Sequence, residues 1–214
     1  MLYTETVPPA TLELLKDLMT DAQLNEFFLV GGMALSLQIN HRISIDLDFF
    51  TLKEFNENVL STHLETQRNF KLDSLARNTI KGKIDKVIVD LITHSYPLAK
   101  EVNLIEGVRL ASLEDIAAMK LNAIVGNGTR LKDFIDIAYL SSHLSLNEML
   151  DAYEHKYSSR NHVMVLKSLS YFDDVNQHEP IKLFDAVYQW DAIKARILAM
   201  IEEPDKLFES SPMR

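Results

Sequence analysis

The chain has 214 residues, 47% of them apolar, which suffices for one sizeable core and allows one domain or two packed lobes. A formal charge of −9 argues against broad electrostatic attraction to nucleic acid, although it leaves room for a local basic patch. The absence of cysteine excludes disulfides, thiolate zinc sites and cysteine nucleophiles. No apolar run reaches the roughly eighteen residues that span a bilayer, and the first residues lack a signal-peptide pattern, so we expect a cytoplasmic protein.

The first part of the sequence alternates between helix and strand patterns. Two prolines followed by apolar residues at helical spacing predict an amphipathic helix over residues 8–19. The apolar run 27–30 predicts a strand, which Gly31 and Gly32 close before a short amphipathic helix over residues 34–39. Because glycine has no Cβ, backbone N–H groups at such a turn can approach a phosphate closely. The turn is therefore a candidate phosphate-binding element.

Two aspartates follow in the run 44–50, which reads Ser-Ile-Asp-Leu-Asp-Phe-Phe. Residues two apart on a strand share a face, so we expect Asp46 and Asp48 to project together and the apolar residues to point to the other side. Like charges held side by side repel unless a cation or a shared proton offsets the repulsion. A lone Asp-x-Asp is more often a solvated pair, but its position after the Gly-Gly turn predicts a site for a hard divalent cation that binds substrate phosphates.

The next segment contains a helix signal and then strand signals. Residues 51–54 match a capping box, which predicts a helix to about residue 65. Residues 67–79 and 86–94 predict two strands joined around residues 81–83, so the sheet should have at least four strands.

Charged residues in this segment have two interpretations each. Asp90 interrupts the apolar strand 86–94, where a carboxylate is costly unless it pairs with a neighbouring Lys or Arg or binds a metal. Residues 66–86 carry six basic side chains against two acidic ones, a local charge of +4. They predict either a solvated hairpin or a local patch that binds nucleic acid.

From residue 112 onward the pattern is helical almost throughout. Ser112-x-x-Asp115 predicts one helix cap, and Ser145-x-x-Glu148 another. The Gly-rich segment 126–129 should separate the first of these helices from one that begins near residue 130. Further helices are expected over residues 160–170 and after residue 180, the last containing the single tryptophan.

Two charged positions in this helical part are ambiguous. Lys120 falls on the inward-facing stripe of its helix, where a lysine either snorkels outward or meets an anion such as a phosphate. Lys132 and Asp136 have the spacing of a simple surface pair, worth only a few tenths of a kcal/mol.

The stretches 29–50 and 112–136 resemble the AbiEii/AbiGii-type nucleotidyltransferase toxins, a branch of the DNA polymerase β-like nucleotidyltransferase superfamily. Its members carry a Gly-Ser or Gly-Gly turn, then Asp-x-Asp on the next strand, and a third acid on a neighbouring strand. The toxin family adds a Lys-x-x-Ala segment and an Arg-x-x-Asp or Lys-Asp element. This chain departs from the pattern at Gly32, where serine is common, and at Asn127, where a basic residue is expected.

The resemblance implies a set of site residues. Three acids would bind Mg²⁺ or Mn²⁺, namely Asp46, Asp48 and Asp90. These acids would also act in catalysis, together with Lys120 and Asp133. The NTP would be contacted by Gly31, Gly32, Ser44, Lys120, Arg130 and Lys132.

The predicted fold class is α+β, with a nucleotidyltransferase lobe over residues 1–111 and a mostly helical lobe over residues 112–214 packed on it. The first lobe should hold a mixed β-sheet flanked by helices. The resemblance implies transfer of a nucleoside monophosphate from an NTP to an acceptor hydroxyl, with release of pyrophosphate. It also implies a bacterial toxin of a toxin–antitoxin or phage-defence system, with a cognate antitoxin.

The acceptor and the activity have alternatives. The resemblance points to RNA, such as a tRNA 3′ end, which the basic segment 66–86 would bind. Transfer to a small molecule or a protein would suit the net charge of −9 better. A catalytically silent module that binds NTP or a partner would suit the departures at Gly32 and Asn127.

Overall fold

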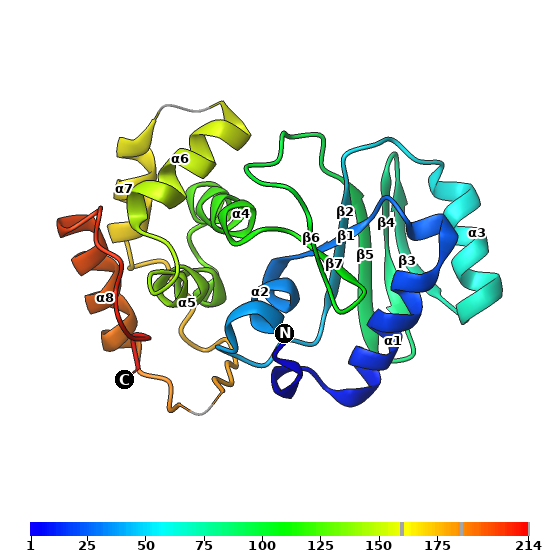
Figure 1. Ribbon diagram of the computed structural model, residues 1–214, viewed down its shortest axis with the longest axis horizontal. Helices are drawn as coiled ribbons and strands as arrows, with labels where there is room; N and C mark the ends of the chain where they lie inside the picture. The colour runs from blue at the N-terminus through cyan, green and yellow to red at the C-terminus, as the bar shows by residue number, and fades with distance from the viewer. Residues whose placement is uncertain (159–160, 185, 214) are drawn as a thin grey trace. The chain divides into compact units, whose positions relative to one another are not determined.

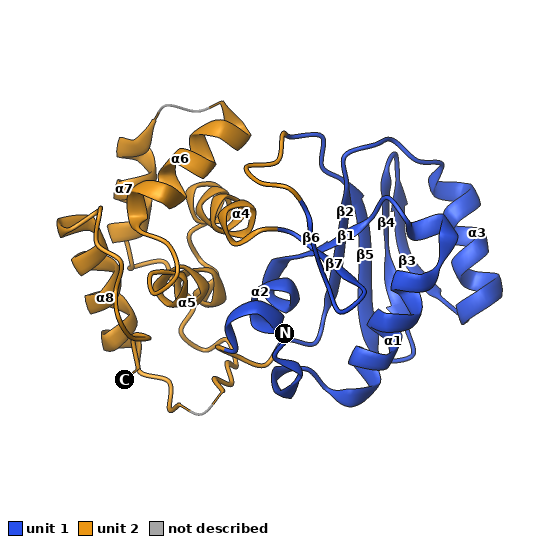
Figure 2. Cartoon of the chain, in the orientation of Figure 1, with its two compact units in different colours: residues 1–40, 44–96, 102–111 blue, residues 41–43, 97–101, 112–214 orange. Residues whose placement is uncertain are grey.

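A computed structural model describes residues 1–158, 161–184 and 186–213. The chain forms two compact units, coloured separately in Figure 2. The sheet unit comprises residues 1–40, 44–96 and 102–111. The helical unit comprises residues 41–43, 97–101 and 112–214. The predicted α+β class is thus confirmed, while the division into two lobes at residue 111 stays a prediction.

The described residues of the sheet unit form a mixed sheet of seven strands in the order β3-β4-β5-β2-β1-β7-β6. The pairs β2–β5 and β1–β7 are parallel, and the other four pairs are antiparallel. The strands are β1 Phe28–Val30, β2 Leu47–Thr51, β3 Lys71–Ala76, β4 Thr79–Ile84, β5 Val87–Thr93, β6 Asn103–Ile105 and β7 Val108–Leu110.

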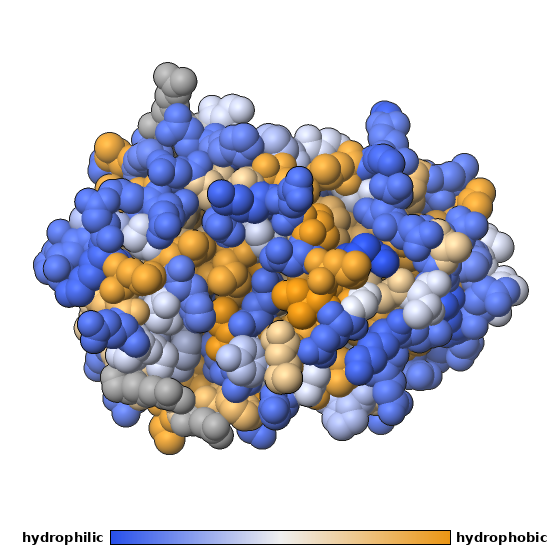
Figure 3. Space-filling model, in the orientation of Figure 1, coloured by the Kyte–Doolittle hydropathy of each residue, from blue (hydrophilic) through white to orange (hydrophobic). Residues whose placement is uncertain are grey.

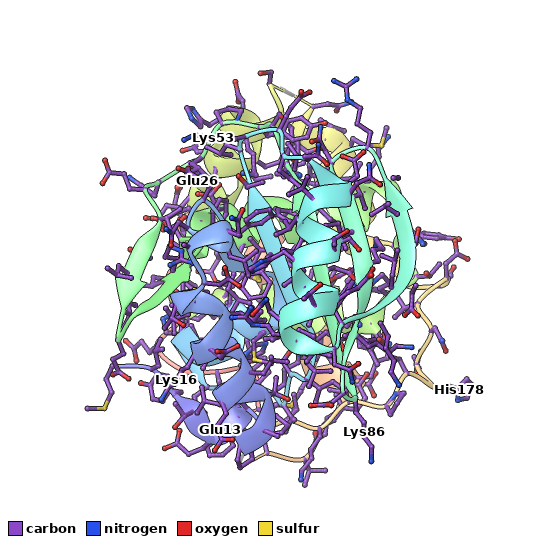
Figure 4. The ribbon with its side chains drawn as sticks, turned by 90° about the vertical axis from the view of Figure 1, so that its right-hand side faces the viewer. Glu13, Lys16, Glu26, Lys53, Lys86 and His178 are labelled. Atoms are coloured by element: carbon purple, nitrogen blue, oxygen red, sulfur yellow. The ribbon has the colours of Figure 1, made fainter. Side chains whose placement is uncertain are left out.

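Helices lie on both sides of this sheet (Figure 1). In the sheet unit they are α1 Pro9–Thr20, α2 Gly31–Ile39 and α3 Glu57–Arg68, with short 3₁₀ turns at Thr4–Thr6 and Ala22–Leu24. One face is covered by α1, which packs on β7, and by α3, which packs on β3 and β4 (Figure 4). On the opposite side α2 packs on β1 and β2. The apolar faces of these elements form the core of the unit.

The helical unit contains five α-helices within its described residues. They are α4 Leu113–Gly126, α5 Leu131–Leu140, α6 Leu146–Tyr157, α7 His162–Ser170 and α8 Trp190–Glu202. The predicted caps are confirmed: the Ser112 hydroxyl accepts from the N–H of Asp115, and Ser145 with Glu148 forms a complete capping box. The predicted helix over residues 160–170 is present from His162, and Arg160 lies outside the described residues.

The predicted capping box at residues 51–54 is wrong. Thr51 is the last residue of β2 and pairs with Thr93 of β5, so its backbone belongs to the sheet and not to the start of a helix. The following helix, α3, begins at Glu57, where the Asn56 side chain accepts from the N–H groups of the first turn. Sheet pairing outweighed a local capping signal here.

The expected hairpin turn at residues 81–83 is also wrong, because these residues form the middle of β4. The turns that flank β4 contain Asn78 and Asp85, which have φ angles of +55° and +54°. Asparagine and aspartate tolerate this left-handed conformation, so each supports a tight turn without glycine. The sheet therefore gains a strand that the sequence interpretation merged into its neighbours.

Gly82 serves a different purpose from a turn glycine. A Cβ at this position would collide with the carbonyl oxygen of Lys71 and the ring of Phe70. Since backbone cannot easily move away, we expect Gly82→Ala to lower the free energy of unfolding by at least about 2 kcal/mol. Urea denaturation would measure this loss. Gly126→Ala is the matched control, because a Cβ there meets no atom within 4 Å, and its stability should be unchanged or slightly higher.

The surface of the sheet unit is mainly hydrophilic over α3, with single apolar residues among the polar ones (Figure 3). Val59 on this helix has 60% of its surface exposed. Scattered apolar residues of this kind are normal on a folded protein. Among the described residues, no helix combines the length and the apolar composition needed to cross a bilayer.

Candidate active site

Two carboxylates lie abreast on neighbouring parallel strands. Asp48 of β2 is in register with Asp90 of β5, and residues in register project to the same face of the sheet. Adjacent strands are about 4.8 Å apart, so these two side chains are close enough to share a cation. The expectation that Asp90 lies beside the aspartate-bearing strand is confirmed.

Asp46 lies outside this strand, so the prediction that both aspartates share one strand face is wrong for Asp46. β2 begins at Leu47, and the preceding residues follow other partners. The N–H of Ser44 donates to the carbonyl of Thr6 at 3.2 Å, and Ile45, expected on the apolar side of the strand, is 57% exposed. Asp46 is half-buried two residues before Asp48, at the entrance to the strand.

Gly31 allows the Asp48 carboxylate to approach the start of α2. Its φ angle is +68°, which favours glycine, and a Cβ here would lie 2.8 Å from Oδ2 of Asp48. The helix begins at Gly31, and its N-cap residue Val30 supplies no side-chain hydrogen bond to the first turn. The carboxylate thus lies against the N-terminus of α2, where the helix dipole favours negative charge.

Asp90 also has a basic neighbour. Nζ of Lys81 on β4 lies 3.0 Å from Oδ2 of Asp90, and the two residues are in register. The Asp90 side chain is 15% exposed, whereas that of Lys81 is 48% exposed. The ion-pair interpretation of Asp90 is therefore realised, and the half-exposed lysine has room to leave if a cation takes its place.

The donor set fits a hard cation shared with a substrate. Across the described ranges, no three histidine, aspartate or glutamate side chains gather closely enough to hold an ion by themselves. Mg²⁺ at phosphoryl-transfer sites is usually held by one or two carboxylates, with water and substrate phosphates completing its shell. Asp48 and Asp90 supply two such carboxylates, and Gly31 leaves the space beside Asp48 that a Cβ would fill.

A second charged cluster lies in the helical unit, around Asp136 of α5. Arg42 holds this carboxylate with two hydrogen bonds, from Nε to Oδ1 at 2.7 Å and from Nη2 to Oδ2 at 3.0 Å. Nζ of Lys120 lies 2.7 Å from Oδ2 of Asp136 and 2.7 Å from Oδ1 of Asp133. Nε2 of His41 lies 2.8 Å from Oδ1 of Asp136. All five residues of this Asp136 cluster are buried.

The protonation states in the Asp136 cluster follow from these contacts. Burial alone would raise the pKa of Asp136, but Arg42 and Lys120 hold that pKa well below its ordinary value. The two aspartates outweigh burial and raise the pKa of Lys120, so the ammonium stays charged. Burial lowers the pKa of His41, which is therefore neutral near pH 7. Because an ionised carboxylate only accepts, neutral His41 must carry its proton on Nε2.

A pH experiment can test the state of His41. A folded-state pKa below 6.5 means that, as the pH falls, the His41 side chain is protonated in the unfolded chain before it is protonated in the folded protein. The contribution of neutral His41 to the free energy of unfolding is therefore fully present above about pH 6.5 and is lost as the pH drops below that value. The slope from this group is at most about 1.4 kcal/mol per pH unit. His41→Gln keeps a donor for Asp136 but cannot titrate, so urea denaturation between pH 7.5 and 5.5 should show a smaller loss than in wild type. Substitution of the exposed His178 by glutamine should leave the wild-type slope.

The helical unit places the remaining predicted residues as follows. Lys120 does not snorkel, because its ammonium is buried between two carboxylates. The surface pair expected between Lys132 and Asp136 is wrong, since Nζ of Lys132 lies 3.3 Å from Oε1 of Glu179 and Asp136 is buried. Arg130 is half-exposed, with its Nε 3.5 Å from Oδ2 of Asp133. Roles for Lys120, Arg130, Lys132 and Asp133 in nucleotide binding stay predictions.

The sequence interpretation missed two buried charged groups in the helical unit. One is the Asp136 cluster, for which the available signal was a pair of acids three residues apart on the apolar face of α5. The other joins Lys156 of α6 to Asp115 of α4, with Nζ 2.8 Å from Oδ1. Asp115 also accepts from the N–H groups of residues 99–100, and Lys156 donates to the carbonyl of Pro97. This second group anchors residues 97–101 to α4 and α6.

Two crystal structures from Helicobacter pylori share the fold of this chain. One is a candidate nucleotidyltransferase, with a TM-score of 0.56 and 19% identity, covering 92% of this chain and 96% of that chain. The other is JHP933, with a TM-score of 0.54 and 18% identity, covering 93% of each chain. Both structures match this chain over its mixed sheet and its helical part. The chain therefore has a nucleotidyltransferase-like fold.

Family membership follows from the sequence matches. Residues 13–97 and 61–209 match the model of the nucleotidyl transferase AbiEii toxin of type IV toxin–antitoxin systems, and the chain belongs to this family. A relative is the uncharacterized protein aq_aa25 of Aquifex aeolicus (strain VF5). It is 31% identical over 159 residues, which are 72% of this chain and 77% of that protein.

Proposed function

We propose that this chain is a Mg²⁺- or Mn²⁺-dependent enzyme that moves a nucleoside monophosphate from an NTP to an acceptor hydroxyl and releases pyrophosphate. The observation that supports it is the pairing of Asp48 with Asp90 in register, beside a helix N-terminus opened by Gly31. Two carboxylates abreast on a sheet face repel each other, and a cation held between them would offset this repulsion more fully than the ion pair of Asp90 with Lys81 does. Membership of the AbiEii family supports the same reaction class.

The residues of the sheet unit would divide the work at this site. Asp48 and Asp90, with Asp46 at the entrance to β2, would hold the ion, which when bound offsets the charge that develops on the phosphates. Gly31, Gly32 and the first turn of α2 would donate backbone N–H groups to phosphate oxygens. Asp90 would also accept the proton of the acceptor hydroxyl, once its ion pair with Lys81 is broken.

Residues of the helical unit would contribute to NTP binding. The half-exposed Arg130 has a guanidinium suited to a phosphate, and Asp133 accepts from Lys120. Lys120 itself is neutralised by two aspartates, so we propose that it acts chiefly by holding Asp133 in place. Lys132 and, in the sheet unit, Ser44 complete the set that the family resemblance suggests.

We further propose that the protein is the toxin of a toxin–antitoxin or phage-defence pair, with a cognate antitoxin and with RNA as acceptor. The description of the matched family supports the toxin role. The basic segment 66–86 is partly neutralised, since Arg68 pairs with Asp17 and Asp21, and Arg77 pairs with Glu54. On β4, Lys81 pairs with Asp90, and Nζ of the half-exposed Lys83 lies 3.3 Å from Oδ2 of Asp73. Because exposed pairs of this kind are weak, we propose that Lys71 and Lys83 are the part of this segment that best suits an RNA backbone.

A labelling experiment tests the proposed function. Purified protein would be incubated with each α-labelled NTP, Mg²⁺, total RNA and a protein fraction, with a chelator in a parallel sample. Label in RNA together with released pyrophosphate, both lost with the chelator, supports the proposal. Label in protein or small molecules would identify a different acceptor. If no NTP is consumed with Mg²⁺ or Mn²⁺, the chain is a silent nucleotide- or partner-binding module.

The contribution of the lysines can be measured through salt. Lys71 and Lys83 are in register on neighbouring strands, and reversal of both to glutamate should weaken binding of single-stranded RNA. With two fewer phosphates neutralised, the slope of log affinity against log salt should decrease by about 1.4. Lys81 is left intact because it contacts Asp90.

The control for this charge reversal is the double variant Lys16→Glu and Lys53→Glu. Both lysines are labelled in Figure 4: Lys16 lies on α1, which packs on β7, and Lys53 follows β2 and pairs with Glu26 at 2.9 Å. The control carries the same change in net charge. Equal salt slopes for the two double variants would contradict a specific role for Lys71 and Lys83.

A further inference from the structure

The sheet face that carries Asp48 has three rows of side chains, set by the pairing of β3, β4, β5 and β2. In the basic row, Lys71, Lys83 and Ile88 are paired in register. In the acidic row, the paired residues are Ser74, Lys81, Asp90 and Asp48. In the apolar row, they are Ala76, Thr79, Ile92 and Phe50. Every member of the three rows is exposed or half-exposed. The alternate residues of β4 and β2 are buried, as are Val89 and Leu91 in the middle of β5.

The apolar row continues into a stack of aromatic rings. The ring of Phe50 lies against that of His94, with centroids 4.7 Å apart and planes 23° apart. The ring of His94 in turn lies 4.7 Å from that of Tyr96, tilted by 47°, and Tyr96 is 47% exposed. His94 directly follows β5, and its N–H donates to the carbonyl of Thr51 at 2.8 Å. The ring stack is therefore fixed to the end of the sheet.

The order of these features along the strands matters. The rows are two residues apart along β4, β5 and β2, so about 7 Å separates the acidic row from the rows on either side there. On β3 a register shift between Leu72 and Ser74 adds one residue to this spacing. The ring stack begins at Phe50, on one side of the two carboxylates, and the lysines of the basic row lie on the other side. Aromatic faces bind nucleobases whatever their sequence, and lysines bind the phosphates between them.

We propose that the stack of Phe50, His94 and Tyr96 binds the terminal base of a single-stranded polynucleotide acceptor. The inference rests on the proposed function and adds the subsite that selects an acceptor with a base. A base on this stack would carry its ribose hydroxyl toward Asp48 and Asp90. Lys71 and Lys83 would meet the phosphates of the adjoining nucleotides.

A polynucleotide suits this surface better than the base of the NTP. Phosphate-binding groups lie on two sides of the carboxylates, at the Gly31 turn and at the basic row. One triphosphate would occupy the turn, which leaves the lysines for a second chain of phosphates. An acceptor with a backbone supplies that chain, whereas a protein hydroxyl or a small alcohol would not.

The test is a binding measurement that needs no turnover. The probe is a short single-stranded RNA with 2-aminopurine as its last base, whose fluorescence falls when the base stacks on an aromatic ring. Wild-type protein should quench the probe, and Phe50→Leu and Tyr96→Leu should each weaken binding about tenfold, the loss expected for one stacked base. Tyr3→Leu is the matched control, because Tyr3 is 46% exposed and belongs to none of the three rows; its N–H donates to the carbonyl of Leu37 in the last turn of α2.

Two further binding measurements test whether the rings contact the last base of the RNA or the NTP. An RNA that lacks its last base should bind wild type and the Tyr96 variant equally, because the contact being tested is gone. Binding of a fluorescent NTP with Mg²⁺ should be the same in wild type and both variants. Tyr96 is exposed, so this variant remains informative even if Phe50→Leu unfolds, which a thermal melt would show.

Each outcome decides the proposal. Equal binding of the 2-aminopurine probe by wild type and Tyr96→Leu overturns it, as does a loss confined to NTP binding, which would assign the rings to the nucleotide donor. Absence of probe quenching by wild type overturns it as well. Failure of the labelling experiment with intact base-dependent binding would instead reject the proposed transfer reaction and keep the binding subsite.

Discussion

Replacement of Asp48 by asparagine should lower the rate of nucleotidyl transfer about a thousandfold, equivalent to about 4 kcal/mol of transition-state stabilisation. The substitution keeps the size of the side chain that lies against Gly31 but removes the charge needed to hold the cation beside Asp90. Folding should be little affected in metal-free buffer, because relief of the repulsion between the two carboxylates offsets the lost interaction with the N-terminus of α2. Pyrophosphate release and the thermal melting temperature are the two measurements.

Two further variants test whether the loss is specific to the paired carboxylates. Asp90→Asn should show a loss of similar size, since either carboxylate alone binds the ion poorly. Asp151→Asn removes an exposed carboxylate of α6 and should keep full activity. The stabilisation that Mg²⁺ and NTP together confer on wild type should vanish in Asp48→Asn. An equal thermal shift in both proteins would remove Asp48 from the metal site.

The second large effect is expected on stability, at Asp136. Asparagine at this position leaves the Arg42 guanidinium and the Lys120 ammonium buried without the carboxylate that faces both. Breaking a buried charge pair in this way costs about 3–5 kcal/mol, because the remaining charges lose their compensation. We therefore expect Asp136→Asn to lower the free energy of unfolding by that amount in urea denaturation at pH 7.

The control for Asp136 is Asp191→Asn, which breaks the ion pair with Lys194 at the start of α8. The Asp191 side chain is 93% exposed, so this change should cost less than about 1 kcal/mol. The pH dependence adds a check. Because the folded-state pKa of Asp136 lies well below its ordinary value, its contribution is present above about pH 4 and is lost as the pH falls through the folded-state pKa. A loss in Asp136→Asn no larger than that of the control would show that the cluster does not stabilise the fold.

Local signals in the sequence correctly predicted several elements. The prolines at the start of α1, the cap at Ser112 and the capping box at Ser145 act within one turn of the chain, so sequence spacing suffices to recognise them. The strand before Gly31 and the aspartates after it belong to a short motif whose chemistry depends on residue type and order. The family resemblance rested on the same residues, and the family match supports it.

Other features depended on partners far away in the sequence. Gly82 looks like a turn residue until the ring of Phe70 is found over it, and Thr51 looks like a helix cap until it pairs with β5. Asp46 and Asp48 are two residues apart, the spacing of side chains on one face of a strand. The structure shows that β2 begins at Leu47, between them, so only Asp48 lies in the strand.

The charged residues show the same division most clearly. The sequence by itself identified Lys120 as unusual on an apolar stripe and Asp90 as unusual on an apolar strand, because burial of a lone charge is unfavourable wherever it occurs. Only the tertiary structure shows which opposite charges compensate each one: Asp133 and Asp136 pair with Lys120, and Lys81 pairs with Asp90. Coulombic compensation requires contact within a few ångström, and contacts between distant residues are created by folding.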